Sequence, residues 1–384
     1  MDISNKDLTF SLNTDELERY KRHITLKEIG LQGQKYLKNS AILFVGAGGL
    51  GSSAILYIAA SGIGKIGIID NDKVEKSNLQ RQIIHDSFSI GQNKTESAKK
   101  KIQELNPHCI VKIFTKRLSQ KNAMEIISEF DIVCDCSDNF PTRYLVNDTC
   151  IILNKPMIYA SVQGFEGQLS VFNLNNNSPN LRDLLPKSPQ SQNIPSCEQY
   201  GVMGISTGLI GVLQANEIIK IVTKTGKILD GEILIFNLLT MTMKKLHLKA
   251  NKKYKEIPNL EVFNNFYQEL DCKINNQNIK TIALEEFKKL YRENLSKILI
   301  IDVREEEEFK SLSLNGSISL PLDLVEKKSS LTLIKKNSIG KKIYTICKKG
   351  IRSENASRIL MSHQINSISI EGGIDNLIRG KFFD

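Results

Sequence analysis

The sequence lacks three features that would narrow its class at once: tryptophan, a C-x-x-C pair and a long apolar run. No apolar run reaches the roughly 18–20 residues that a membrane-spanning helix needs, so we expect no membrane segment. The first residues are polar and acidic, without the pattern of a signal peptide or an Arg-rich transit peptide. We therefore expect a soluble intracellular protein, cytoplasmic or, if the gene is organelle-encoded, in the plastid stroma.

The thiol and imidazole side chains show no pattern of a metal site or a catalytic triad. The seven cysteines are an odd number, which with the missing signal peptide favours free thiols in a reducing compartment. The five histidines have no metal-ligand spacing, and no Ser/His/Asp set can be argued. No function is therefore assigned to a histidine.

Positive charge is abundant but is not concentrated anywhere. The net charge is +10, and residues 1–279 and 280–384 carry +5 each. Nucleic-acid binding usually depends on a clustered basic patch, so we expect no nucleic-acid partner. Attraction to an acidic protein stays compatible with this charge.

A short apolar run at residues 41–45 breaks into glycines. Gly46, Gly48 and Gly51 fill a G-x-G-x-x-G pattern, in which glycine lets backbone N–H groups approach a phosphate at a helix N-terminus. Asp70 ends the next apolar run, 19 residues after Gly51, where a carboxylate can bond a ribose hydroxyl. These residues predict a nucleotide site, and fit a nicotinamide dehydrogenase and an ATP enzyme equally.

The segment after Asp70 favours the ATP enzyme. Arg81 and Lys94 could neutralise a triphosphate, whereas hydride transfer has little need for two cations. Asn78 and Gln80 add neutral hydrogen-bonding groups to the same segment.

Asp138-Asn139 follows the strand that ends at Asp135. A carboxylate there could hold Mg²⁺ against phosphates. It could also cap the following helix, whose first turn contains Pro141. One residue could do both.

Strands alternate with helical stretches from residue 41 to about 160. This alternation predicts a Rossmann-like, doubly wound α/β sheet, mostly parallel, with ligands at the carboxyl ends of its strands. The predicted strands are 41–45, 66–70, 110–114, 131–136 and 157–160, followed by antiparallel additions at 167–172 and within 233–248. The predicted helices are 15–38, 52–62, 93–105, 119–129, 141–153 and 205–224.

The composition changes after residue 250, which ends the first predicted domain. Residues 251–280 are rich in Lys, Asn, Glu and Gln and predict a linker. Residues 281–384 alternate again and predict a separate small α/β domain. Its predicted strands are 298–302, 343–346 and 367–370, with helices near 305–310 and over 352–363.

Two cysteines differ from the others in their surroundings. Cys347 opens the run C-K-K-G-I-R-S after a strand, where loop N–H groups and the side chains of Lys348, Lys349 and Arg352 favour an anionic sulfur. Cys197 lies among polar residues before an apolar helix, whose N-terminus could lower a thiol pKa. By itself, Cys197 is more often an inert loop cysteine.

The glycine loop, the run S-N-L-Q-R-Q at 77–82, Lys94 and Asp138-Asn139 resemble the MoeB/ThiF family, relatives of the ubiquitin-activating enzymes. The resemblance implies adenylation of the C-terminal Gly-Gly carboxylate of a small ubiquitin-like sulfur-carrier protein, with Mg²⁺ held by Asp138. It also implies a homodimer, in which Arg22 reaches into the partner's site, and a chemical role for Cys197. The nucleotide-binding residues are then Gly46, Gly48, Gly49, Gly51, Asp70, Ser77, Asn78, Leu79, Gln80, Arg81, Lys94, Asp138, Asn139 and Arg22.

Members of this family usually carry two C-x-x-C pairs that bind structural zinc. The matching positions here are Asn180, Asp183 and, in a looser alignment, Leu260 and Phe263. These side chains cannot form a tetrahedral thiolate site, so we predict no zinc. We expect the loop at 175–195 to be anchored instead by apolar packing of Leu181, Leu184 and Leu185.

Residues 280–384 resemble a rhodanese domain. The loop fits C-x-x-G-x-R-S, and the runs at 301–305, 315–322 and 371–374 match rhodanese landmarks in order. The tryptophan that usually follows the Gly-Gly pair is absent, which affects packing more than chemistry. A phosphatase-like interpretation is weaker, because the closing spacing and a general acid are missing.

The two resemblances together predict one reaction sequence on an ATP-activated carrier. Cys347, loaded as a persulfide by a donor such as a cysteine desulfurase, attacks the acyl adenylate, and Cys197 resolves the product or carries a transient acyl group. The catalytic residues are then Arg81, Asp138, Cys197 and Cys347. The expected carrier is the small subunit of molybdopterin synthase, followed by a thiamine or tRNA-thiolation carrier. Interpretations of other classes are an NAD-dependent oxidoreductase with a rhodanese-like regulatory tail, and a scaffold that binds the carrier without turnover.

Overall fold

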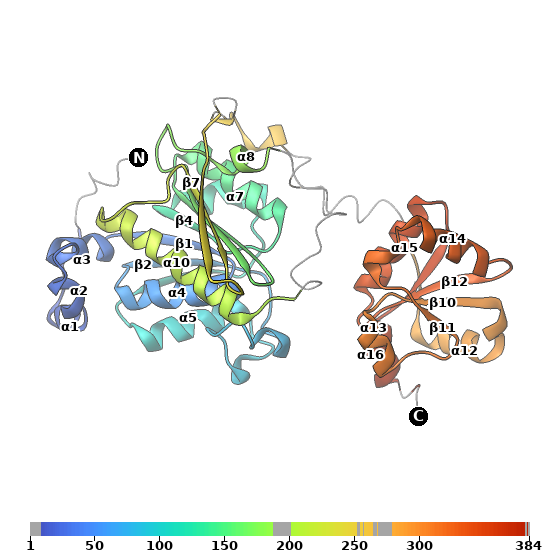
Figure 1. The fold of residues 1–384 in the computed structure, drawn as a ribbon. Helices are drawn as coiled ribbons and strands as arrows, with labels where there is room; N and C mark the ends of the chain where they lie inside the picture. The colour runs from blue at the N-terminus through green and yellow to red at the C-terminus, as the bar shows by residue number, and fades with distance from the viewer. Residues whose placement is uncertain are drawn as a thin grey trace. The chain divides into compact units, whose positions relative to one another are not determined.

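The computed structural model describes residues 9–186, 201–251, 254–255, 257–263, 267, 279–380 and 382. The chain divides into two compact units, Met1–Leu270 and Asp271–Asp384 (Figure 1). The division falls within the stretch that the composition marks as a linker.

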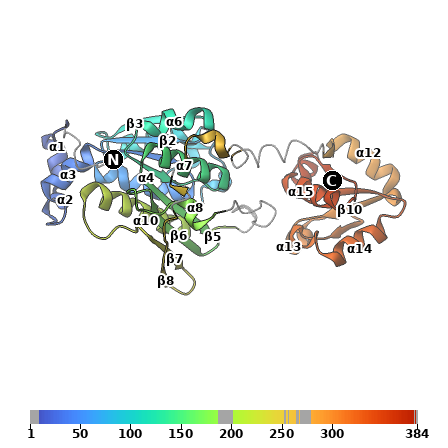
Figure 2. The same cartoon turned by 90° about the horizontal axis from the view of Figure 1, so that it is seen from above.

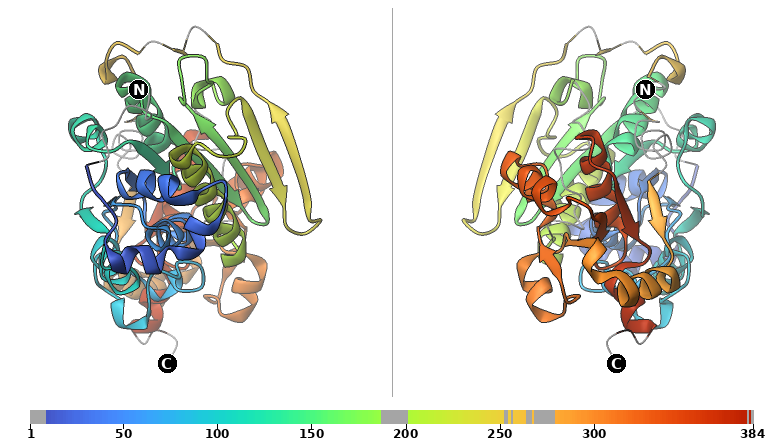
Figure 3. Two further views of the ribbon diagram at one scale, coloured as in Figure 1. Left: turned by 90° about the vertical axis from the view of Figure 1, so that its left-hand side faces the viewer. Right: turned by 90° about the vertical axis from the view of Figure 1, so that its right-hand side faces the viewer.

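The first unit is built on one eight-stranded sheet with the order β3-β2-β1-β4-β5-β6-β7-β8. The first five strands are parallel, and β5 to β8 pair antiparallel, with β8 at the outer edge (Figure 3). The bounds are β1 Ala41–Val45, β2 Lys65–Ile69, β3 Ile110–Phe114, β4 Ile132–Asp135, β5 Met157–Gln163, β6 Glu166–Phe172, β7 Glu232–Asn237 and β8 Thr242–His247. The predicted mostly parallel, doubly wound sheet with antiparallel additions is confirmed.

Helices cover both faces of this sheet (Figure 2). Successive residues of β1 serve opposite faces: Ile42 and Phe44 pack in one buried cluster, and Leu43 and Val45 in the other. This is why the strand is apolar throughout. The helices are α4 Gly49–Ser61, α5 Lys94–Leu105 and α10 Gly204–Thr223 with the first cluster, and α6 Gln120–Ser128 and α7 Phe140–Leu153 with the second.

Helix α10 is long and apolar enough to cross a membrane by length and composition alone, which the run-length argument from sequence did not anticipate. It packs against α4 and against β5 and β6. Gly211 lets α10 approach α4 closely, because a Cβ there would lie 2.3 Å from the Leu50 carbonyl oxygen. These contacts account for its apolar composition as a core helix of the first unit.

The predicted helix at 15–38 is wrong in its continuity. Three helices occupy this stretch: α1 Thr14–Arg19, α2 Lys21–Thr25 and α3 Gly30–Lys38. Leu26 ends α2 in an extended conformation, and Gly30 begins α3 with a φ of +59°. Both conformations interrupt the helical hydrogen bonds, although the apolar spacing continues.

The remaining short elements of the first unit lie in its connections. They are η2 Lys76–Asn78, η3 Ser87–Ser89, α8 Leu181–Leu184 and η5 Leu260–Phe263.

The second unit is a five-stranded parallel sheet with the order β11-β10-β12-β13-β9. Its strands are β9 Lys280–Ile282, β10 Ile298–Asp302, β11 Ser317–Ser319, β12 Lys342–Ile346 and β13 Ser367–Ile370. Its helices are α12 Leu284–Asn294, η6 Leu295–Lys297, α13 Glu306–Ser311, η7 Leu322–Leu324, α14 Lys328–Asn337, α15 Ile351–Ser362 and α16 Gly373–Arg379. The separate small α/β fold agrees with the prediction, but β9, β11, α12, α14 and α16 were not predicted.

Candidate active site

The glycine loop lies where β1 gives way to α4, at the point in the sheet where strand order reverses between β1 and β4. Gly46 has a φ of +103°, and a Cβ on it would lie 2.8 Å from the Cys136 carbonyl oxygen. A Cβ on Gly51 would lie 2.3 Å from the Gly46 carbonyl oxygen. Only glycine fits both positions, and the tight turn opens α4 at the usual ligand edge of such a sheet.

Asp70 is bonded to the glycine loop itself. Its Oδ2 accepts the Ala47 N–H at 2.8 Å, and its Oδ1 accepts the Asp72 N–H at 2.8 Å. Burial raises the pKa of the Asp70 carboxyl, while Lys94 and these hydrogen bonds oppose the rise. The carboxylate therefore helps to shape the loop, which is more than the ribose contact predicted for it.

Lys94 comes to the same edge as the first residue of α5. Its side chain is almost fully buried, and its Nζ pairs with Asp72 Oδ2 at 2.9 Å. It influences the pKa of both Asp70 and His85, so its charge acts directly on the loop region.

The 77–82 run forms a compact turn around η2. Asn78 is buried, and its Oδ1 accepts the Glu75 N–H at 3.0 Å. Arg81 is half-buried and donates from Nη1 to the Ser77 carbonyl at 3.1 Å. Leu79 is half-buried, and Ser77 and Gln80 are exposed.

The turn and the glycine loop both touch the start of α10. A Cβ on Gly204 would lie 2.3 Å from the Gln80 carbonyl oxygen, and one on Gly49 would lie 2.9 Å from Thr207 Oγ1. The structure thus brings the glycine loop, the 77–82 turn and the N-terminus of α10 together.

Asp138 follows β4 and is exposed, with its Oδ1 3.3 Å from Asn139 Nδ2. The cap of α7 is made by Asn139, whose Oδ1 accepts the Thr142 N–H at 3.0 Å. The capping role considered for Asp138 therefore belongs to its neighbour. An exposed carboxylate next to the Cys136–Gly46 contact fits Mg²⁺, which commonly takes one protein carboxylate together with substrate phosphates.

Two of the predicted site residues are not found near the glycine loop among the described residues. Arg22 is exposed in the last turn of α2. Cys197 lies outside the described residues.

Two buried side chains beside the loop were missed from the sequence. Gln82 Nε2 is 3.8 Å from the place of a Cβ on Gly48, and its buried Oε1 has no hydrogen-bond partner within the described part of the chain. His85 bonds to Ala47 and Ser97. The last residue of S-N-L-Q-R-Q pointed to Gln82, but no local pattern marks His85.

The positions that match the family's zinc-binding pairs hold side chains that make other contacts. Asn180 caps α8 and donates from Nδ2 to the Tyr254 carbonyl at 3.0 Å. Asp183 Oδ1 accepts the Asn251 N–H at 2.8 Å. Leu260 is buried in an apolar cluster. These residues do not fit a zinc ion, and two of them fasten α8 to the segment after β8.

A buried ion pair reinforces the same region. Arg182 Nε and Nη2 donate to Asp148 Oδ1 and Oδ2 at 2.8 and 2.6 Å, with both side chains almost fully buried. Tyr267 donates its hydroxyl to Asp148 Oδ2 at 2.5 Å. Leu181 is buried and Leu184 and Leu185 pack on the same cluster. The predicted apolar packing is therefore present in the described part of this loop, residues 175–186, where a polar network shares the role. Residues 187–195 lie outside the described residues.

The second unit holds the cysteine loop between β12 and α15. Cys347 is buried, and its Sγ accepts the Gly350 N–H at 3.1 Å. Gly350 has a φ of +99°, which directs its N–H back into the loop. A Cβ on Gly373 would lie 2.1 Å from the Cys347 carbonyl oxygen, so the Gly-Gly turn supports the loop from behind.

Arg352, predicted to favour an anionic sulfur, interacts electrostatically with Cys347 and also has an ion-pair partner of its own. It donates from Nη1 and Nη2 to the two oxygens of Glu308 at 2.7 and 2.8 Å. The Arg352 guanidinium lowers the pKa of the Glu308 carboxyl. The cations that stay exposed on this loop are Lys348 and Lys349.

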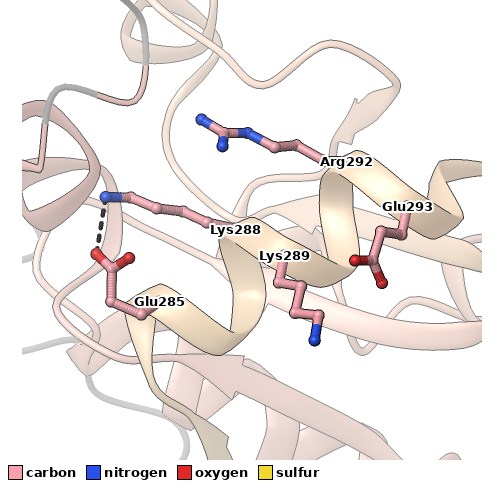
Figure 4. A pocket seen from close by; sticks show the side chains of 5 residues that line it. All are labelled: Glu285, Lys288, Lys289, Arg292 and Glu293. Carbon is pink, nitrogen blue, oxygen red and sulfur yellow. Dashed lines mark hydrogen bonds and ion pairs between the residues drawn. The ribbon is translucent and has the colours of Figure 1, made fainter.

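A hollow beside α12 is not a comparable site (Figure 4). It is lined by charged side chains from one helix, Glu285, Lys288, Lys289, Arg292 and Glu293. Lys288 already pairs with Glu285 at 2.9 Å and donates to the Gly380 carbonyl at 2.9 Å. This is a solvated helix face.

Comparison with known proteins identifies the family of each unit. Residues 20–257, more than half of the chain, match the ThiF family. The chain belongs to the ThiF family. Residues 283–379 match the rhodanese-like domain, so this ThiF-family chain carries both of the predicted domains.

Relatives of this ThiF-family protein match 92–97% of its length. A "Probable molybdopterin-synthase adenylyltransferase" of Porphyra purpurea is 41% identical over 97% of this chain and 94% of its own. One with the same name from Pyropia yezoensis is 39% identical over 94% and 93%. An adenylyltransferase and sulfurtransferase of Aedes aegypti is 36% identical over 92% and 84%.

The solved structures match the ThiF domain in fold. E. coli MccB, crystallised with ATP, has a TM-score of 0.55 at 23% identity, covering 62% of this chain and 73% of its own. PaaA has a TM-score of 0.55 at 22% identity, covering 64% and 78%.

Proposed function

We propose that this chain adenylates the C-terminal Gly-Gly carboxylate of a small ubiquitin-like sulfur-carrier protein and then converts it to a thiocarboxylate. The observation that carries the proposal is the joint presence, in one ThiF-family chain, of the glycine loop with Asp70 and Lys94 and of the Cys347 loop. The first supplies a site for nucleotide phosphates, and the second holds a sulfur against a backbone donor.

In the first step a carboxylate oxygen of the carrier attacks the α-phosphorus of ATP, and pyrophosphate leaves. Lys94 and Arg81 stabilise the charge that develops on the leaving phosphates, and N–H groups at the start of α4 bind phosphate oxygens. Asp138 would hold Mg²⁺, which supplies further positive charge to the phosphates when bound. We propose the other residues of the glycine loop and of the 77–82 turn as further nucleotide contacts.

In the second step the terminal sulfur of a Cys347 persulfide attacks the acyl carbon, and AMP leaves. The acyl group is then joined to Cys347 through a disulfide. Attack by the Cys197 thiolate on the Cys347 sulfur releases the thiocarboxylate and forms a Cys197–Cys347 disulfide, which a thiol reductant reopens. A transient acyl group on Cys197 is the alternative course.

The proposal extends to the partners. The names of the Porphyra and Pyropia relatives support the small subunit of molybdopterin synthase as the carrier, ahead of a thiamine or tRNA-thiolation carrier. A cysteine desulfurase is the proposed persulfide donor. We also propose a homodimer, in which Arg22 of each chain enters the partner's ATP site, and a location in the cytoplasm or plastid stroma.

The test is carrier-dependent exchange of pyrophosphate into ATP, followed by mass spectrometry of each candidate carrier after addition of a sulfur donor. We expect exchange, and a mass gain on one carrier equal to replacement of one oxygen by sulfur. Tight NADH binding without exchange would favour an oxidoreductase, and carrier binding without exchange would favour a scaffold. In either case the adenylation proposal is wrong.

A further inference from the structure

His85 lies beneath the glycine loop, although nothing in its sequence context marks it. The residue is 6% exposed. Its Nε2 is 3.0 Å from the Ala47 carbonyl oxygen, and its Nδ1 is 2.9 Å from Ser97 Oγ. Ser97 is on α5, the helix that begins with Lys94, so His85 joins the loop to the helix that carries the buried cation.

The two contacts determine which nitrogen carries the proton. A carbonyl oxygen only accepts, so Nε2 is the protonated nitrogen and donates to Ala47. Burial lowers the pKa of His85 to about 4, which keeps the ring neutral near pH 7. Nδ1 therefore has a lone pair and accepts a hydrogen bond from the Ser97 hydroxyl.

Ala47 is held on both of its backbone groups. Its N–H donates to Asp70 Oδ2 at 2.8 Å, while its carbonyl accepts from His85 at 3.0 Å. The peptide that follows is planar and trans, so fixing the Ala47 carbonyl directs the Gly48 N–H to the opposite side, away from His85. Within the described residues the Gly48 N–H has no protein acceptor, which leaves it available to a phosphate oxygen.

We infer that His85 is a positioning residue for ATP, acting through its Nε2 hydrogen bond to the Ala47 carbonyl to aim the Gly48 N–H at a phosphate. This inference rests on the proposed adenylation. The inference goes beyond adenylation because it assigns a role to a side chain that does not itself contact the nucleotide.

The test separates the two nitrogens of the ring in the full-length protein. Gln places its side-chain nitrogen, a donor, near Nε2. Asn places its amide group near Nδ1, where Oδ1 can accept from the Ser97 hydroxyl and no donor reaches the Ala47 carbonyl. His85→Gln keeps a donor for Ala47 and loses the bond to Ser97, whereas His85→Asn does the reverse. Binding of ATP with Mg²⁺ is measured by titration calorimetry, beside the melting temperature of each variant.

We expect His85→Asn to weaken ATP binding about tenfold, as the loss of one oriented hydrogen bond would. His85→Gln should stay within about threefold of the parent. Ser97→Ala removes the other contact alone and should behave like His85→Gln. Ile127→Val, in the buried face of α6, is the matched control that lowers stability without touching the loop.

Equal loss of affinity in His85→Asn and His85→Gln, in step with equal loss of melting temperature, would overturn the inference in favour of a packing role. Unchanged affinity in His85→Asn would overturn it as well. If the parent chain does not bind ATP, the adenylation proposal and this inference both fall. If the parent binds and only the Asn/Gln difference is absent, adenylation stands and the positioning role alone is wrong.

Discussion

At the scale of single residues, the conformation of the glycine loop depends on side chains and backbone groups from distant parts of the chain. Ala47 is bonded to Asp70 after β2 and to His85 beyond the 77–82 turn. Gly46 fits because Cys136, after β4, leaves no room for a side chain. The loop is therefore shaped from three neighbouring strand ends.

The buried, neutral His85 makes stability depend on pH. Its pKa is about 4 in the folded protein, lowered from an ordinary 6.5, so the unfolded chain binds more protons between these values. Stability contributed by the neutral ring is thus complete above about pH 6.5 and is lost as the pH falls to about 4, by about 3 kcal/mol. Lys94, by repulsion, and Asp86, by attraction, are the charged groups that act on the ring.

Urea unfolding of the parent and of His85→Gln across pH 4–7 measures this contribution. As the pH falls, the unfolding free energy of the parent should decrease relative to that of His85→Gln, because glutamine binds no proton. A difference that does not change with pH would contradict the buried neutral ring.

At the scale of elements, α8 is held by a buried polar network. Tyr267, Asp148 and Arg182 form a continuous buried chain of charge-assisted hydrogen bonds. Burial raises the pKa of the Tyr267 phenol, and the Asp148 carboxylate adds to this, so the hydroxyl stays a donor. The segment that leads toward residue 187 is thus fixed at α8.

Arg182→Met should lower the free energy of unfolding by about 3–5 kcal/mol, because it leaves the buried Asp148 charge without its main partner. Chemical denaturation measures the loss. The double variant Asp148→Leu/Arg182→Met should regain part of it, because no unpaired charge stays buried. A single variant that loses less than about 1 kcal/mol, the range of an exposed pair, would contradict the structural role of this network.

Metal removal provides a second test at this scale. Asn180, Asp183 and Leu260 bind backbone groups or pack in the core and do not offer a thiolate set. Dialysis against a strong chelator should therefore leave the melting temperature unchanged, and elemental analysis should find no stoichiometric zinc. A large fall in melting temperature, reversed by added zinc, would show a metal site elsewhere.

At the scale of the whole molecule, two units with separate cores carry separate chemistry. The first contains the glycine loop, and the second contains Cys347 on a parallel sheet of its own. Each buried cluster of the described residues lies within one unit, so each loop is supported by the core of its own unit.

Cys347→Ser should therefore abolish thiosulfate sulfurtransferase activity, because the oxygen cannot carry sulfane sulfur, while carrier-dependent pyrophosphate exchange persists. The two assays are run on the same preparation of the full-length protein. Simultaneous loss of both activities would contradict two independent sites. Asp138→Ala is the reciprocal variant, which should lose AMP formation and keep the thiosulfate reaction.

The sequence by itself determined the local patterns that make up this protein. The runs at 41–45 and 298–302 became strands with those same bounds, because nearly continuous apolar residues between polar turns suit a strand buried on both faces. The run at 110–114 also kept its bounds, although it contains Lys112 and forms a partly exposed edge strand. The glycine loop, the S-N-L-Q-R-Q run and the cysteine loop could also be predicted, because each motif is a continuous stretch of the sequence. The interruption of residues 15–38 was not visible, because amphipathic spacing continues across Leu26 and Gly30.

Only the tertiary structure decided which side chains meet. Arg352 lies at the start of α15, after the cysteine loop, and its guanidinium pairs with Glu308 on α13, 44 residues earlier in the sequence. His85 acquires a role because Ala47, 38 residues earlier, turns its carbonyl toward it. Arg182 is buried because the Asp148 carboxylate on α7 compensates its charge, and Tyr267 donates a further hydrogen bond to that carboxylate. Such contacts depend on sheet order and helix packing, which bring together residues whose own neighbours in the sequence carry no trace of the pairing.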